Sequence, residues 1–172
     1  MVRPDDVRSS LPVHPVPHRP TTLPLVRVDG LVNRVLDLRP ADLMALPQQE
    51  VVGDFTCVEG WTVPHVSWQG VPLREVLDLA GVRAEAHWLQ ASAGPFSVPL
   101  PDEVWETALL ALRLGDEDLS VEHGGPVRLA VPGQACFTSV KWLDHLEVRA
   151  TAGPNTAEEI ALGRMASHAA IR

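Results

Sequence analysis

Cys57 is one of two cysteines in the chain, and it lies where a predicted strand over residues 50–57 meets a turn. A side chain at this position can project from the edge of a sheet and act as a ligand. A lone cysteine can equally be a small buried hydrophobic residue. Cys57 has no histidine near it in the sequence, so nothing indicates a cysteine–histidine hydrolase. The thiolate could still be the single protein ligand of a metal whose other ligands come from a cofactor, since a soft sulfur donor suits that role.

A second group of residues suited to chemistry begins at His123, which two glycines and a proline follow directly. These residues fix a tight loop that leads into a predicted strand over residues 127–131. Rigid backbone can therefore present both His123 and Arg128 at one end of that strand. The planar guanidinium of Arg128 is suited to a phosphate or to the edge of a planar heterocycle.

Ser139 and Lys141 form a third group, two positions apart in a predicted strand over residues 139–148. The period of two in a strand places both side chains on one face. A hydroxyl and an ammonium on one face can bind phosphate together. The alternative is that Arg128 and Lys141 are ordinary charges at strand edges.

The composition limits the partners that these groups can serve. The 172 residues carry 14 basic and 22 acidic side chains, for a formal charge of -8, so general binding of nucleic acid or anionic lipid is not expected. Cys57 and Cys136 form no CxxC pair, which excludes a zinc ribbon. The sequence shows no signal peptide and no run long enough to span a bilayer, so we expect a cytoplasmic protein without membrane insertion.

The elements that must position these groups alternate between strands and short helices. Strands are expected over residues 25–28, 31–38, 50–57, 87–92, 96–100, 127–131 and 139–148, with a hairpin edge at 68–70. Helices are expected over residues 40–46, 72–79, 101–107 and 157–169. Several connections are too short for parallel crossovers, so the fold class is α+β with mixed, mostly antiparallel sheets.

Composition divides the chain into three parts. Residues 1–23 are a proline-rich N-terminal arm, residues 24–150 form the folded domain, and residues 151–172 are a C-terminal tail with a helix. The length and the share of apolar residues are those of one globular domain.

Three motifs in register resemble one known family. The segments 54–64 (DFTCVEGWTVP) and 68–73 (WQGVPL) resemble the metal-ligating segment of the sulfite oxidase-type molybdopterin-binding family, in its small single-domain bacterial form. The segments 123–133 (HGGPVRLAVPG) and 139–143 (SVKWL) resemble the pterin-binding loop and strand of that family. The resemblance covers about residues 25–148.

The resemblance implies a mononuclear molybdenum held by the dithiolene sulfurs of molybdopterin and by the thiolate of Cys57, which would be both metal ligand and catalytic residue. It also implies that His123 and Arg128 bind the pterin and its phosphate, and that Ser139 and Lys141 complete the phosphate pocket. A dianionic phosphate in an acidic protein needs several local donors, which agrees with these residue types.

The function implied is that of a molybdenum–molybdopterin-dependent oxidoreductase, which performs oxygen-atom transfer or a related two-electron redox step on a small-molecule substrate. The alternative is a non-catalytic cofactor-binding or interaction protein on the same fold. The chain has no haem-attachment or iron–sulfur motif, so a separate electron-transfer partner is expected. A monomer or a weak dimer is expected because the 172 residues are too few to include the additional dimerisation domain of longer family members.

Some positions depart from the pattern of the family. The N-terminal arginine–asparagine–histidine segment has its best counterpart at Arg8, with His14 or His18 as substitutes for the missing histidine. Thr62 replaces the arginine that holds sulfite in sulfite oxidases. Further on, Cys136 replaces a glycine and Thr138 a basic residue, and the chain has no tyrosine. Thr62 argues against sulfite as the substrate, and together these departures leave the prediction of cofactor binding stronger than that of turnover.

Overall fold

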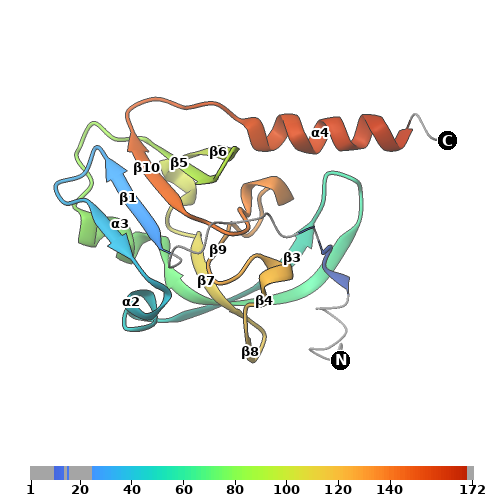
Figure 1. Ribbon diagram of the computed structural model, residues 1–172, viewed down its shortest axis with the longest axis horizontal. Helices are drawn as coiled ribbons and strands as arrows, with labels where there is room; N and C mark the ends of the chain where they lie inside the picture. Colours follow the sequence, from blue (N-terminus) through green and yellow to red (C-terminus); the bar gives the residue numbers. More distant parts are fainter. Residues whose placement is uncertain (1–9, 14, 16–24, 170–172) are drawn as a thin grey trace.

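The computed structural model describes residues 10–13, 15 and 25–169, which fold into two β-sheets with a few short helices (Figure 1). The first sheet has the order β2-β1-β10-β5-β6. The second has the order β3-β4-β7-β8, and β9 also pairs with β7. Only the β1–β10 pair is parallel among the strand pairs of the described residues, so the predicted α+β class with mostly antiparallel sheets is confirmed.

The strands of the first sheet are β1 (Val26–Gly30), β2 (Leu36–Leu38), β5 (Trp88–Ala93), β6 (Phe96–Pro101) and β10 (His145–Arg149). The strands β1, β5 and β6 lie close to the positions that the sequence predicts, whereas β2 and β10 begin later than predicted. Gly30 ends β1 with φ +88°, and a Cβ there would lie 2.2 Å from the carbonyl oxygen of Val148. Only glycine fits where β1 leaves its partner β10.

The second sheet contains β3 (Gln49–Thr56), β4 (Thr62–Pro72), β7 (Leu109–Leu114), β8 (Glu117–Asp118) and β9 (Arg128–Ala130). The predicted hairpin edge at 68–70 is wrong, because β4 runs through these residues and pairs with β3 on one side and β7 on the other. A Cβ at Gly70 would lie 2.0 Å from the carbonyl oxygen of Leu110. That glycine therefore marks a close approach of two backbones at a bulge and not a turn.

The helices are α2 (Pro40–Met44), α3 (Leu73–Ala80) and α4 (Thr156–Ala169), all near predicted positions. Gly81 ends α3 in the left-handed region with φ 69°, as its place in the sequence predicts. The helix predicted over residues 101–107 is wrong. Only a single 3-10 turn, η1 (Asp102–Val104), forms there, because the chain turns back to begin β7 at Leu109.

Buried side chains form two clusters. The larger cluster fills the space between the first sheet, α3 and the inner residues of the second sheet, and its largest members include Leu73, Leu89 and Leu146. The smaller cluster lies on the other face of β4 and β7, where it includes Trp68 and also Leu11 of the proline-rich arm. None of the helices within the described residues is both long and apolar enough to cross a bilayer.

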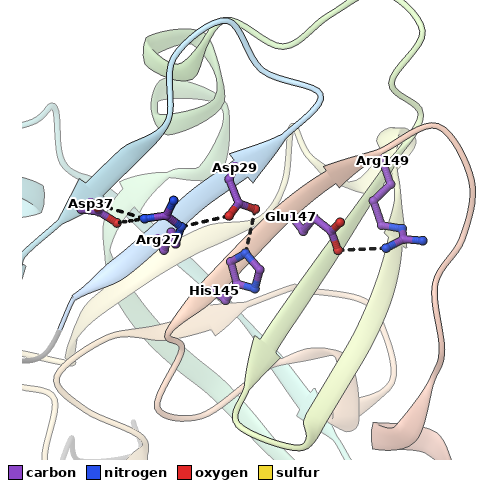
Figure 2. A network of polar contacts seen from close by, with 6 residues as sticks. All are labelled: Arg27, Asp29, Asp37, His145, Glu147 and Arg149. Atoms are coloured by element: carbon purple, nitrogen blue, oxygen red, sulfur yellow. Dashed lines mark hydrogen bonds and ion pairs between the residues drawn. The ribbon is translucent and has the colours of Figure 1, made fainter.

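A network of charged side chains crosses the outer face of the first sheet (Figure 2). Asp29 accepts from the Nε2 of His145 at 2.8 Å and from the Nε of Arg27 at 3.0 Å, and Arg27 also reaches Asp37 at 3.1 Å. Partial burial raises the pKa of Asp29, but the hydrogen bonds from His145 and Arg27 outweigh it, so that pKa lies below its usual value. The network therefore links β2, β1 and β10 at neutral pH.

Candidate functional site

Cys57 lies at the turn of the β3–β4 hairpin, as the sequence predicts. Its backbone N–H donates to the carbonyl of Trp61 at 2.9 Å, and its carbonyl accepts from Gly60 at 3.0 Å. Gly60 has φ +91°, and no atom lies within 4 Å of a Cβ placed there, so the turn is open to solvent. Cys57 itself is partly exposed, which leaves its thiol accessible to a ligand.

The thiol of Cys136 lies against that of Cys57, with 3.3 Å between the two Sγ atoms. Cys136 begins the 3-10 turn η3 (Cys136–Thr138), which lies 79 residues further along the chain. Burial raises the pKa of the Cys57 thiol to about 11, helped by the contact with Cys136 and opposed by a backbone hydrogen bond from Glu59. A metal that binds Cys57 must therefore displace a proton.

Arg128 is the most deeply buried charged group of the site, with 3% of its surface exposed. Its Nη1 donates to the carbonyl of His123 at 3.0 Å, whereas its buried Nε has no hydrogen-bond partner among the described residues. The guanidinium lies 4.7 Å from the ring centre of Trp68 and 5.3 Å from that of Phe55. Burial lowers the pKa of Arg128 to about 10, and the nearby Cys136 partly offsets this. It is therefore not an ordinary charge at a strand edge.

The glycines after His123 are required by two close contacts. Gly124 has φ +103°, and a Cβ there would lie 2.8 Å from the Cβ of Lys141. A Cβ at Gly125 would lie 2.0 Å from the carbonyl oxygen of Leu119. The loop therefore packs its backbone at Gly124 against Lys141, which the sequence could not show.

The predicted strand over residues 139–148 is wrong in its first half, so the inference that Ser139 and Lys141 share a strand face is also wrong. Residues 139–144 form turns and irregular backbone, and Trp142 has φ 54°. The cause is the route of the chain, which leaves the second sheet beside β9 and must bend before it enters β10 in the first sheet.

Ser139 and Lys141 consequently make different contacts. The Oγ of Ser139 accepts from the backbone N–H of Val131 at 3.1 Å and so holds the loop after β9, while its hydroxyl proton is left for another acceptor. The Nζ of Lys141 donates to the carbonyl of Pro12 at 2.9 Å and to that of Glu122 at 3.0 Å. Burial, followed by the charges of Arg128 and Arg164, lowers the pKa of Lys141 to about 7.

Contacts connect the predicted residues into one site. Cys57 contacts Cys136, which lies within electrostatic range of Arg128. Arg128 donates to the backbone carbonyl of His123, and Gly124 packs against Lys141. Within the described part of the chain, neither Arg128 nor Lys141 forms an ion pair with a carboxylate. A buried cation without a counter-ion fits a site for an anionic group.

The donor set also fits a metal that brings most of its own ligands. The described residues contain no group of three or more histidine, cysteine or acidic side chains that could hold a metal ion. The thiol of Cys57 is a soft ligand that is linked through Cys136 to the buried guanidinium of Arg128, and one thiol cannot complete a metal site alone. The residues therefore fit a cofactor that supplies further soft ligands and carries a phosphate.

Sequence reasoning missed two features of the site. Cys136 stands where the family has a glycine, but no local signal in the sequence places it against Cys57. Arg164 of α4 lies close enough to lower the pKa of Lys141, and its only signal is its position on a predicted helix. Arg8, His14 and His18, which the family pattern suggests as further contacts, lie outside the described residues.

An open depression of about 590 Å³ lies beside α3, away from these residues. It is lined by Arg74, Arg83, His87, Asp102 and Trp105, among others. His87 and Asp102 form an exposed contact of 2.9 Å there. The depression contains none of the predicted site residues, so it does not bear on the chemistry of Cys57.

The comparison with known families decides the assignment. A family model described as the oxidoreductase molybdopterin binding domain matches residues 14–157. The chain belongs to this family. The resemblance seen in the sequence is thereby confirmed, and the cofactor of the family is molybdenum–molybdopterin.

Individual relatives agree with the family. The chain is 38% identical over 121 residues to an uncharacterized oxidoreductase, YuiH, of Bacillus subtilis. This match covers 69% of this chain and 61% of YuiH. It is 32% identical over 181 residues to the sulfite oxidase of Gallus gallus. This match covers 86% of this chain and 39% of that enzyme. The chain thus spans less than two thirds of the length of either relative.

A solved structure has the same fold. The sulfane dehydrogenase SoxCD from Paracoccus pantotrophus matches with a TM-score of 0.70 and 28% sequence identity. The match covers 74% of this chain and 38% of the SoxCD chain. The α+β arrangement described above is therefore that of sulfite oxidase-type proteins.

Proposed function

We propose that this protein is a molybdenum–molybdopterin-dependent oxidoreductase in which Cys57 is the protein ligand of the metal. The observation that carries the proposal is an accessible thiol near the buried guanidinium of Arg128 and the partly buried ammonium of Lys141, neither of which has a carboxylate partner among the described residues. Family membership supplies the identity of the cofactor, and the site supplies a soft ligand and an anion pocket for it.

Each side chain has a distinct part in this proposal. Cys57 holds the metal through its thiolate. Arg128, whose Nε has no hydrogen-bond partner among the described residues, donates to the pterin or its phosphate, and His123 lies on the loop that leads into its strand β9. Lys141 exchanges the carbonyls that it now contacts for phosphate oxygens, while Ser139 donates its hydroxyl proton. The bound cofactor supplies two-electron redox chemistry, such as the transfer of an oxygen atom.

The substrate that we propose is small and does not depend on a strong cationic pocket next to Cys57. Thr62 is exposed, and its hydroxyl lies 3.1 Å from that of Thr56. The hydroxyl of Thr138 donates to the carbonyl of Ala135 at 2.7 Å. Both positions are neutral, so they offer a substrate anion less attraction than the arginine or lysine usual in the family.

We further propose that the electrons leave to a separate protein. The sequence has two cysteines, which are too few for the four thiolates of an iron–sulfur cluster. It also lacks the CxxCH pattern that attaches a haem. An electron acceptor must therefore approach the molybdenum site from outside the chain as given.

Metal and pterin analysis tests the proposal. The protein is made in a host with an intact molybdopterin pathway, and we expect stoichiometric molybdenum and pterin. Cys57→Ser should lose the metal and change the electronic spectrum, whereas Cys136→Ser is the matched control with the same change 3.3 Å away. A wild-type protein without molybdenum, or a Cys57→Ser variant that retains it unchanged, contradicts the proposal.

A second candidate is a non-catalytic protein that binds or carries the cofactor. The absence of tyrosine from the sequence favours it, because the family commonly has a proton-donating tyrosine near the metal. The two candidates differ in turnover. If the loaded protein changes oxidation state with small oxygen-atom donors and acceptors, it is an oxidoreductase, and if its spectrum stays constant with all of them, it is a carrier.

A further inference from the structure

The two cysteines are close enough to react with each other. Their Sγ atoms are 3.3 Å apart, and a disulfide has an S–S distance of about 2.0 Å, so the sulfurs need to approach by roughly 1.3 Å. Both residues are partly exposed, which allows a small thiol reagent to reach them. No other cysteine is present in the sequence to compete for either partner.

The backbone around both residues can accommodate this approach. Cys57 lies just beyond the last paired residue of β3, in the turn that Gly60 permits. Cys136 begins the short turn η3, in which its carbonyl accepts from Ser139 at 3.2 Å. Neither residue is held by a sheet ladder. A small movement of either turn therefore closes the gap without breaking strand pairs.

We propose that the cofactor-free protein forms a reversible intramolecular disulfide between Cys57 and Cys136, which makes this pair a site of redox modification. The oxidant is a low-molecular-weight disulfide of the glutathione class. One protein thiolate attacks a sulfur of that disulfide and forms a mixed disulfide, which releases one small thiol. The second protein thiolate then attacks the mixed disulfide and releases the other. Two protein thiols are oxidised, one small disulfide is reduced to two thiols, and the atoms balance.

The consequence for the cofactor rests on the proposed function, in which Cys57 ligates the metal. A sulfur bonded to Cys136 has no thiolate to offer, so the oxidised chain cannot take up molybdenum at this position. Reduction returns both thiols and restores the ligand. Bound metal in turn protects Cys57 from oxidation. The pair thus sets the redox conditions under which the cofactor can be inserted.

The first experiment tests the disulfide without any cofactor. Cofactor-free wild type, Cys57→Ser and Cys136→Ser are each incubated with oxidised glutathione and analysed by intact mass and by alkylation of free thiols. We expect the wild type to lose two hydrogens and both reactive thiols. Each variant should instead gain one glutathione, because its partner thiol is missing. Wild type that carries glutathione and no internal bond overturns the proposal, and circular dichroism shows that the variants are folded.

The second experiment separates this proposal from the proposed function. Reduced, oxidised and re-reduced wild type are each mixed with isolated molybdenum–molybdopterin, and the bound metal is measured. We expect the oxidised form to bind at least ~10-fold less, since loss of a ligand costs no less than loss of its supporting contacts. Re-reduction should restore binding. Equal binding by all three forms contradicts the effect of the disulfide on cofactor insertion. If none of the forms binds the cofactor, the proposed function is wrong. In that case the first experiment still shows whether the disulfide forms.

Discussion

Replacement of Arg128 by methionine separates a binding role from a structural one. Methionine keeps the length and apolar character of the side chain but removes the charge and the donors. Arg128 is 3% exposed and has no carboxylate partner in the described part of the chain. If its purpose is to bind an anion, its removal should leave the cofactor-free fold almost unchanged and weaken the binding of the cofactor.

The magnitudes support this expectation. Burial lowers the pKa of Arg128 from its usual value to about 10, which corresponds to about 3 kcal/mol against the charged form in the folded chain. The stacking on Trp68 and Phe55 contributes about 1 kcal/mol each, and the hydrogen bond to the His123 carbonyl about 1 kcal/mol. These terms nearly cancel. The free energy of unfolding of the cofactor-free Arg128→Met variant should therefore lie within about 1 kcal/mol of wild type.

Binding should respond differently. A hydrogen bond between charged groups contributes about 1.5–3 kcal/mol, so the affinity for molybdenum–molybdopterin should fall by roughly 10- to 150-fold. Urea unfolding of cofactor-free protein and titration with isolated cofactor measure the two quantities. Arg113→Met is the control, because Arg113 is 43% exposed on the neighbouring strand β7. A loss of stability above about 3 kcal/mol with unchanged affinity would refute the reasoning and make Arg128 a structural residue.

Three further predictions follow from other contacts. The pKa of Lys141 is lowered from 10.5 to about 7, so between these pH values the folded chain binds fewer protons than the unfolded chain. The free energy of unfolding of the cofactor-free protein therefore rises with pH in this range, by at most ~1.4 kcal/mol per pH unit. Urea unfolding at several pH values should show this slope in wild type and not in Lys141→Met, and equal slopes contradict it. Asp29, whose pKa is lowered, contributes stability above the usual carboxylate pKa that is lost as pH falls through its folded pKa. Asp29→Asn should therefore lose up to about 1 kcal/mol at neutral pH and unfold less steeply on acidification, as followed by circular dichroism. Gly125→Ala should cost about 1–3 kcal/mol in thermal unfolding, since its Cβ would meet the Leu119 carbonyl at 2.0 Å. Gly53→Ala, with its nearest contact at 4.0 Å, is the control, and equal losses would show that the clash is relieved.

The fold could be predicted where local patterns determine it. The hairpin around Gly30, the helix that ends at Gly81 and the C-terminal helix α4 all carry their own turn, cap or periodicity signals. The errors occur where tertiary contacts determine the local structure. The prediction of a hairpin edge at 68–70 fails because the sequence does not show that another backbone approaches Gly70.

The site shows the same limit. The type and order of its residues predicted a thiol ligand and an anion pocket, but their contacts depend on segments far apart in sequence. Strand propensity in residues 139–148 could not reveal that the chain crosses from one sheet to the other at Trp142. The contact between Cys57 and Cys136 joins residues 79 positions apart, and no local pattern encodes it.

Lys141 shows why boundaries drawn from composition separate groups that act together. Its ammonium donates to the carbonyl of Pro12 in the proline-rich arm, and the charge of Arg164 in the tail helix helps to lower its pKa. Both residues lie outside the predicted domain 24–150. Carbonyl oxygens satisfy the hydrogen bonds of an ammonium without neutralising its charge. No carboxylate among the described residues compensates the positive charge of Lys141, so we expect a bound anion to do so, and both the arm and the tail helix take part in the electrostatics of that binding step.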